Sequence, residues 1–195
     1  MSWPTAPDGT MTCMTETSDR YRRLAADMTE TIHHVPDERW GDTSPCPDWT
    51  ARDVVQHLVD THGMFIGFVG RSLPAGPSVD DDPLASWVFA RDRMQEDLDD
   101  PERAGAEFDG SSGRTTFAKA VDRFICLDLV IHRWDLARAT GQDAKIDPSE
   151  LERIWQDVDS FADKMRVPGA FGEAIEPRLD ASPQDRLLAF LGRQT

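Results

Sequence analysis

The sequence lacks the features expected of a membrane or secreted protein. No run of apolar residues is long enough to span a bilayer, and the N-terminus has no basic segment followed by an apolar one, which a secretory signal requires. The 3 cysteines, Cys13, Cys46 and Cys126, are odd in number and far apart, so neither a disulfide framework nor a CxxC zinc site is indicated. We expect a cytoplasmic protein with reduced thiols and no membrane partner.

Positive charge is also scarce. The 195 residues include 21 Lys and Arg against 36 Asp and Glu, which gives a formal net charge of −15. This balance argues against nucleic acid as a partner. The 6 tryptophans argue against disorder, and the length suits one domain with a substantial core. The first residues contain Pro and Gly without apolar periodicity, so we expect a disordered leader over residues 1–14 and a single domain over residues 15–195.

Apolar residues recur at helical spacing in six segments, most of them bounded by a capping box, a proline or a glycine. These segments are Thr15–Val35, Thr50–Arg71, Pro83–Leu98, Thr116–Thr140, Pro148–Met165 and Pro183–Leu191. No strand is clearly indicated, although Ala106–Phe108 is compatible with a short extended piece. The pattern predicts an all-α fold, in which four long helices form a bundle and a short C-terminal helix packs on its outside.

One segment, Thr116–Thr140, carries polar residues on its apolar face. Asp128 and His132 are four residues apart, so their side chains meet on one side of a helix. An acid and a histidine that face a core cost free energy unless a partner satisfies them. A divalent metal is one such partner, and an Asp–His hydrogen bond or a surface pair is the other. The spacing alone favours the second explanation.

His57 adds a third polar residue at a core position, on the helix that begins near Thr50. Bundles build metal sites from ligands that project inward from facing helices, and two histidines with one carboxylate leave coordination positions open, as in catalytic sites. His62 lies about 140° further round the same helix, so we do not expect it to share a metal with His57. His33 and His34 suit a helix C-terminus, where a cation is favoured.

Two motifs that contain these residues resemble a known family. Ser44–Leu58 and Asp128–Gly141 resemble the actinobacterial DinB-like metal-binding proteins, which are related to the N-terminal domain of mycothiol-dependent maleylpyruvate isomerase. Pro183–Gly192 is similar to the ending of the stand-alone members. The resemblance covers nearly the whole chain from Thr15, and the motifs together are far more specific than the Asp–His spacing.

The resemblance implies a DinB-like four-helix bundle that holds a divalent metal. In the isomerase the ligands are one His on the second helix and a Glu-x-x-x-His on a later helix, and these positions here carry His57, Asp128 and His132. Asp in place of Glu shortens the reach by one methylene, so the helices must approach or Asp128 must bind through water. Two imidazoles suit borderline metals, which makes zinc or nickel the expected ion rather than magnesium.

The resemblance also implies the chemistry of a low-molecular-weight thiol. The isomerase has a further C-terminal domain that contributes to its active site, and this sequence shows no counterpart, so the isomerase reaction is not carried over. What remains is a thiol transferase or isomerase that uses mycothiol and an electrophile, with catalytic residues unknown. Asp60 and Asp135 are candidates for orienting the histidines. Arg133 and Arg138 suit an anionic substrate, although solvated surface positions are commoner for such residues.

Two further interpretations stay open. The chain suits a non-catalytic metal-binding bundle of a stress response, and it also suits a structural module whose metal site is vestigial. In the second case the helices of Trp87 and Trp155 suit a homodimer interface, although tryptophans in apolar stripes more often lie in the core. Nothing in the sequence identifies the electrophile.

Overall fold

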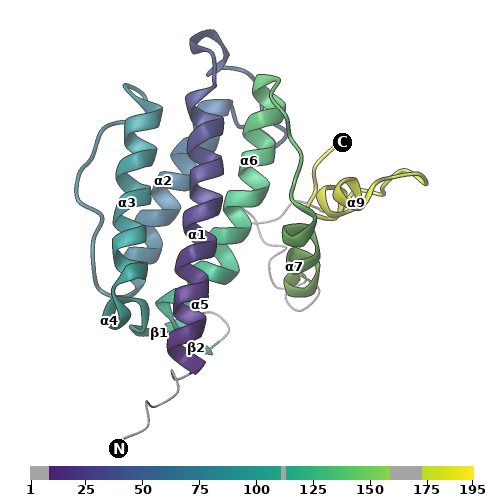
Figure 1. The fold of residues 1–195 in the computed structure, drawn as a ribbon. Helices are drawn as coiled ribbons and strands as arrows, with labels where there is room; N and C mark the ends of the chain where they lie inside the picture. Colours follow the sequence, from purple (N-terminus) through teal and green to yellow (C-terminus); the bar gives the residue numbers. More distant parts are fainter. Residues whose placement is uncertain (1–8, 111–112, 159–172) are drawn as a thin grey trace, which may run out of the picture. The chain divides into compact units, whose positions relative to one another are not determined.

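The computed structural model describes residues 9–110, 113–158 and 173–195, and it confirms the all-α DinB-like bundle (Figure 1). The chain forms two compact units, one of Met1–His34 with Val55–Leu129 and the other of Val35–Val54 with Val130–Thr195. Two helices, α2 (Ala51–Phe68) and α6 (Cys126–Thr140), run from one unit into the other.

The core of the first unit is made by long helices. α1 (Gly9–His33) packs against α3 (Pro83–Asp99), and most of α2 belongs to the same unit. The buried side chains recur at helical spacing, as the sequence predicted. Fully buried examples are Tyr21, Met28, Ile32, Leu58, Trp87, Met94 and Ile125. Trp87 is completely buried, which is the commoner case for a tryptophan in an apolar stripe, and pairing through its helix stays a prediction.

α1 begins earlier than the pattern indicated. The predicted leader reached residue 14, whereas the structure gives helix from Gly9. The reason is local, since no proline interrupts residues 9–14 and Met11 and Met14 continue the helical spacing. Residues 1–8 of the predicted leader lie outside the described residues.

The predicted helix Thr116–Thr140 is interrupted. It consists of α5 (Phe117–Ala120), a π-helical turn η2 (Val121–Ile125) and α6. A single π turn adds one residue to the helical period, which counting at 3.6 residues per turn does not detect. The apolar positions that predicted the helix are nevertheless buried: Val121, Ile125, Leu129 and Leu136.

A small hairpin precedes this helix. β1 (Glu107–Gly110) pairs with β2 (Gly113–Thr116) in antiparallel register, where the sequence indicated only a short extended piece. Both strands are four residues long and mostly polar, so they have no apolar alternation that would reveal them. α4 (Pro101–Ala104) connects α3 to the hairpin.

The second unit contains the later part of α6 and, among the described residues, three short elements. They are η1 (Asp37–Arg39), α7 (Pro148–Val158) and α9 (Pro183–Phe190). Thr50 and Ser182 each form a capping box at the start of a predicted helical segment, and Gly141 ends α6 with φ +75°. The expected continuation of α7 to Met165 lies outside the described residues. Trp155 packs on Phe190 with ring centroids 5.5 Å apart.

None of the helices in the described ranges is both long and apolar enough to cross a membrane.

Candidate metal centre

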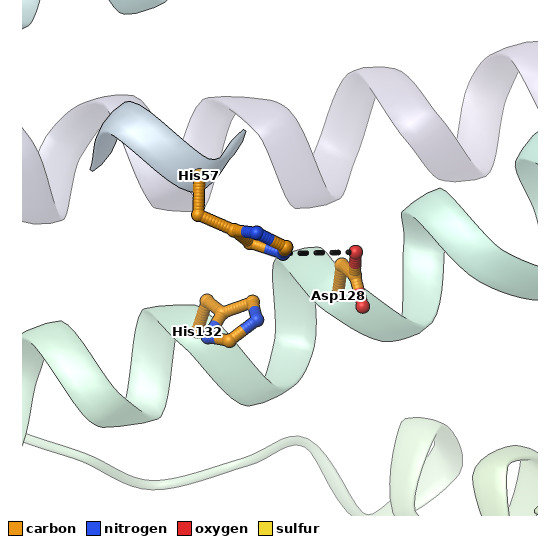
Figure 2. Close-up of side chains that lie close together, drawn as sticks. All are labelled: His57, Asp128 and His132. Carbon is orange, nitrogen blue, oxygen red and sulfur yellow. Dashed lines mark ion pairs between the residues drawn. The ribbon is translucent and has the colours of Figure 1, made fainter. Parts of the chain in front are cut away.

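The side chains of His57, Asp128 and His132 lie close together (Figure 2). α2 carries His57, and α6 carries Asp128 and His132 one turn apart. Because the last two residues share one continuous helix, their spacing follows from helix geometry. Nε2 of His57 lies 3.5 Å from Oδ2 of Asp128, and both side chains are about one quarter exposed, at 26% and 25%.

The donor atoms fit a single divalent ion. One ligand atom from each of the three side chains lies within 4.8 Å of the other two. Atoms that each bind one ion at about 2.1 Å with tetrahedral angles lie about 3.4 Å apart. The His57–Asp128 separation of 3.5 Å matches that value, and it is longer than an ordinary N–H···O hydrogen bond. The sequence predicted these three residues as one cluster, and the structure brings their side chains together; that they hold a metal stays a prediction.

His132 is held by neighbours within the second unit. Its Nδ1 lies 3.0 Å from Oδ2 of Asp135, and its ring stacks on Trp49 at a centroid distance of 5.6 Å. Asp135 is completely buried and is bound in turn by the guanidinium of Arg193, with Nη2 3.0 Å from Oδ2 and Nε 3.4 Å from Oδ1. Arg193 is itself 5% exposed and also donates to the carbonyl of Leu191.

This network fixes the tautomer of His132. Burial raises the pKa of Asp135, but the hydrogen bond from His132 and the charge of Arg193 outweigh it, so that the pKa lies below the ordinary value. An ionised carboxylate only accepts hydrogen bonds, so Nδ1 of His132 is the donor. In the neutral ring the lone pair is then on Nε2. A carboxylate that orients a histidine in this way is typical of metal ligands.

The two acidic residues proposed as orienting partners therefore differ. Asp135 orients His132, as predicted. Asp60 does not orient His57: its Oδ1 accepts a hydrogen bond from Nε2 of Gln56 at 2.8 Å on the exposed side of α2. Besides Oδ2 of Asp128 at 3.5 Å, the hydroxyl of Thr61 lies 3.4 Å from Nε2 of His57. Spacing failed here because Gln56, four residues before Asp60, competes for the carboxylate.

His62 serves the core, in agreement with its exclusion from the metal cluster. Its Nδ1 donates to the carbonyl of Leu58 at 2.7 Å, and its Nε2 accepts from the hydroxyl of Tyr21 at 2.9 Å. The ring also meets Trp87 edge-on at 5.2 Å. Burial lowers the pKa of His62 from 6.5 to about 4, so the ring is neutral at pH 7.

The arginines that the sequence singled out take other roles. Arg133 donates to the backbone carbonyl of Lys145, and the Arg138 guanidinium lies 5.9 Å from the centre of the Trp134 ring. Arg193 is the functional residue that sequence reasoning missed. It follows the last helix and Gly192, where no periodicity or motif distinguishes a buried arginine from a solvated one.

Cys46 and Cys126 agree with a structural role. Cys126 is fully buried in α6, and the thiol of Cys46 sits in a turn closed by Ser44. Burial raises the pKa of Cys46, with Arg193 opposing and Asp135 reinforcing the shift, so this thiol is protonated at neutral pH.

Residues 21–137, more than half of the chain, match the mycothiol maleylpyruvate isomerase N-terminal domain. The chain belongs to this family. The isomerase N-terminal domain family is linked to mycothiol and to metal-binding DinB-like proteins, and the matched range includes His57, Asp128, His132 and Asp135 but ends before Arg193.

Curated relatives carry the match further along the chain. Two uncharacterized proteins of Mycobacterium tuberculosis, Rv0738 and MT0763 from two strains, are each 28% identical to this chain over 164 residues. The aligned part covers 83% of this chain and 89% of each relative. No solved structure matches the chain.

Proposed function

We propose that this member of the isomerase N-terminal domain family binds one divalent metal ion through His57, Asp128 and His132 and uses it to activate a low-molecular-weight thiol. The observation that carries the proposal is the convergence of three donor atoms within 4.8 Å, one of them on a histidine whose other nitrogen is fixed by Asp135. The carboxylate of Asp135 is buried and accepts hydrogen bonds from both His132 and Arg193. Such a partner is expected for a histidine that binds a metal rather than for one in a surface pair.

The donor set suits zinc or nickel, because two imidazoles and one carboxylate match borderline divalent ions and leave positions open for a small molecule. When bound, such an ion lowers the pKa of a thiol, so that it is available as a thiolate at neutral pH. The residues of this chain supply the rest: His57 and Asp128 present donors from facing helices, and Asp135 with Arg193 keeps His132 in one orientation.

The family supports mycothiol as the thiol, and the second substrate is an electrophile that would receive it. Reduced cysteines and an acidic surface support a cytoplasmic protein that acts on small molecules rather than on nucleic acid. The alternative is a bundle that binds the metal without catalysis, and it is favoured by the fact that no general base among the described residues lies in the cluster with the three donor atoms.

The proposal is tested with untagged protein stripped of metal and reloaded with zinc or nickel. Consumption of mycothiol is followed over a panel of electrophiles, including epoxides, quinones and unsaturated acids. We expect turnover that needs the ion and that His132→Ala abolishes. Stoichiometric metal without turnover on any electrophile would favour the non-catalytic bundle, and protein that cannot be reloaded would favour the vestigial site.

A further inference from the structure

A hollow of 540 Å³ lies in the first unit and is separate from the metal-ligand cluster. Its walls come from the end of α2, the hairpin, α5 and η2, and none of His57, Asp128 or His132 lines it. Its volume is within the range of pockets that hold small organic ligands. The lining includes Met64, Phe65, Phe68, Phe108, Phe124 and Lys119.

The apolar lining of this aromatic pocket is a connected group of phenylalanines. Phe65 contacts both Phe68 and Phe124, with ring centroids 5.2 and 6.2 Å apart, and Phe68 stacks on Phe108 at 5.4 Å. Phe68 is 47% exposed and Met64 is 50% exposed, although most large apolar side chains of the described residues are buried. Exposed aromatic surface that lines a hollow is typical of a binding site for an apolar group.

Cations gather around this pocket on an otherwise acidic chain. Its lining contains Arg114, Lys119 and Arg123, with Asp109 as the one carboxylate that the structure places there. Arg114 is engaged by Glu107 at 2.9 Å and by Asp109 at 3.7 Å, so its charge is largely offset. Lys119 is exposed and forms no ion pair with another described residue. Against a net charge of −15, this local excess favours an anionic ligand.

We propose that the aromatic pocket binds a small organic carboxylate with an aromatic or alkyl body. The body packs against Phe65, Phe68 and Phe124, and the carboxylate faces the ammonium of Lys119. The site needs neither a metal nor a thiol, so it stands or falls independently of the function proposed above.

The test uses 1-naphthylacetate and its neutral amide as probes, with metal-free protein and calorimetric or fluorescence detection. Lys119→Gln removes the charge that faces the carboxylate, and Phe68→Ser removes exposed ring surface. Lys145→Gln is the matched control, because Lys145 is an exposed lysine that does not line the pocket. Thermal melting of each variant shows whether it remains folded.

We expect wild type to bind the acid more tightly than the amide. Lys119→Gln should weaken the acid roughly two- to five-fold and leave the amide unchanged, as expected for an exposed charge pair. Phe68→Ser should weaken both probes roughly three- to ten-fold, and Lys145→Gln should change neither. The proposal is overturned if neither probe binds saturably, or if Lys119→Gln and Lys145→Gln have equal effects on the acid.

Discussion

Nδ1 of His132 donates a hydrogen bond to Oδ2 of Asp135 at 3.0 Å, and this contact determines which ring nitrogen can face a metal. It leaves the lone pair of the neutral ring on Nε2. Asp135 is itself fixed by Arg193, so the orientation of the histidine depends on a residue 61 positions further along the chain. Asp135 and Arg193 therefore influence metal binding without being ligands themselves.

The first prediction concerns Arg193. Arg193→Ala leaves the buried carboxylate of Asp135 without its cation, so we expect the free energy of unfolding to fall by about 3 kcal/mol. The affinity for zinc should fall roughly 10- to 100-fold, because His132 loses its fixed orientation. Arg193→Lys should restore part of both. Urea unfolding and zinc titration measure the two effects, and Arg178→Ala, at a position 81% exposed, is the control. Unchanged zinc affinity in a folded Arg193→Ala protein would contradict the orienting role.

The second prediction separates the two acidic residues near the histidines. Asp135→Asn removes the charge that fixes Nδ1 of His132 and should weaken zinc binding roughly 10- to 100-fold. Asp60→Asn should leave it unchanged, because the Asp60 carboxylate bonds to Gln56 instead of His57. Competition with a chelator of known affinity measures both variants. Equal losses from the two substitutions would show that the hydrogen bonds do not decide the role.

The third prediction concerns the carboxylate ligand. Asp128→Asn exchanges a charged donor for a neutral one and should reduce zinc affinity by at least ten-fold, a loss of about 1.4 kcal/mol. Asp128→Glu should retain the ion, since a glutamate lies at this position in the isomerase that the sequence resembles. The zinc titration of both variants is the measurement. Retention by Asp128→Asn together with loss by Asp128→Glu would mean that Asp128 does not bind the metal.

Much of this site was predictable from residue types and spacing together with the resemblance of two motifs to the family, although spacing alone favoured an ordinary pair. Asp128 and His132 are four residues apart on one helix, and the motif around His57 pointed to the same cluster. What spacing does not show is which polar group satisfies a side chain from outside its own helix. Arg193 is such a partner for Asp135, from which it is 58 positions away in the sequence. Within α2, spacing also did not show that Asp60 bonds to Gln56 rather than to His57.

Some features of the fold were likewise predictable from the local sequence, and others were not. The helix starts near Thr50 and Ser182 and the helix end at Thr140 depend on local capping residues, so the sequence predicted them correctly. The π turn η2 and the hairpin of β1 and β2 were not predicted, because one inserted residue and two short polar strands leave no apolar period.

The fourth prediction is a pH dependence from His62, whose pKa falls from 6.5 to about 4 in the fold. Below pH 6.5 the unfolded chain binds a proton that the folded chain does not take up until about pH 4, so the free energy of unfolding falls over that interval. Between pH 7.0 and 5.5 the loss should be about 1 kcal/mol in metal-free protein. His62→Gln keeps a donor for Leu58 and an acceptor for Tyr21 without titrating, so it should remove this slope. Urea unfolding at several pH values tests it, and equal slopes in both proteins would contradict the assignment.

The central claim is that one divalent ion binds to His57, Asp128 and His132. The most direct test is calorimetric titration of metal-free, untagged protein with zinc and with nickel, supported by elemental analysis. His34→Ala is the control histidine, because His34 is exposed and pairs with Glu30, whereas the buried His62 would disturb the core. We predict one ion per chain for wild type and for His34→Ala, and a loss of most of the metal in His132→Ala and in His57→Ala. Wild type that binds neither ion, or His132→Ala that binds as tightly as wild type, would contradict the account.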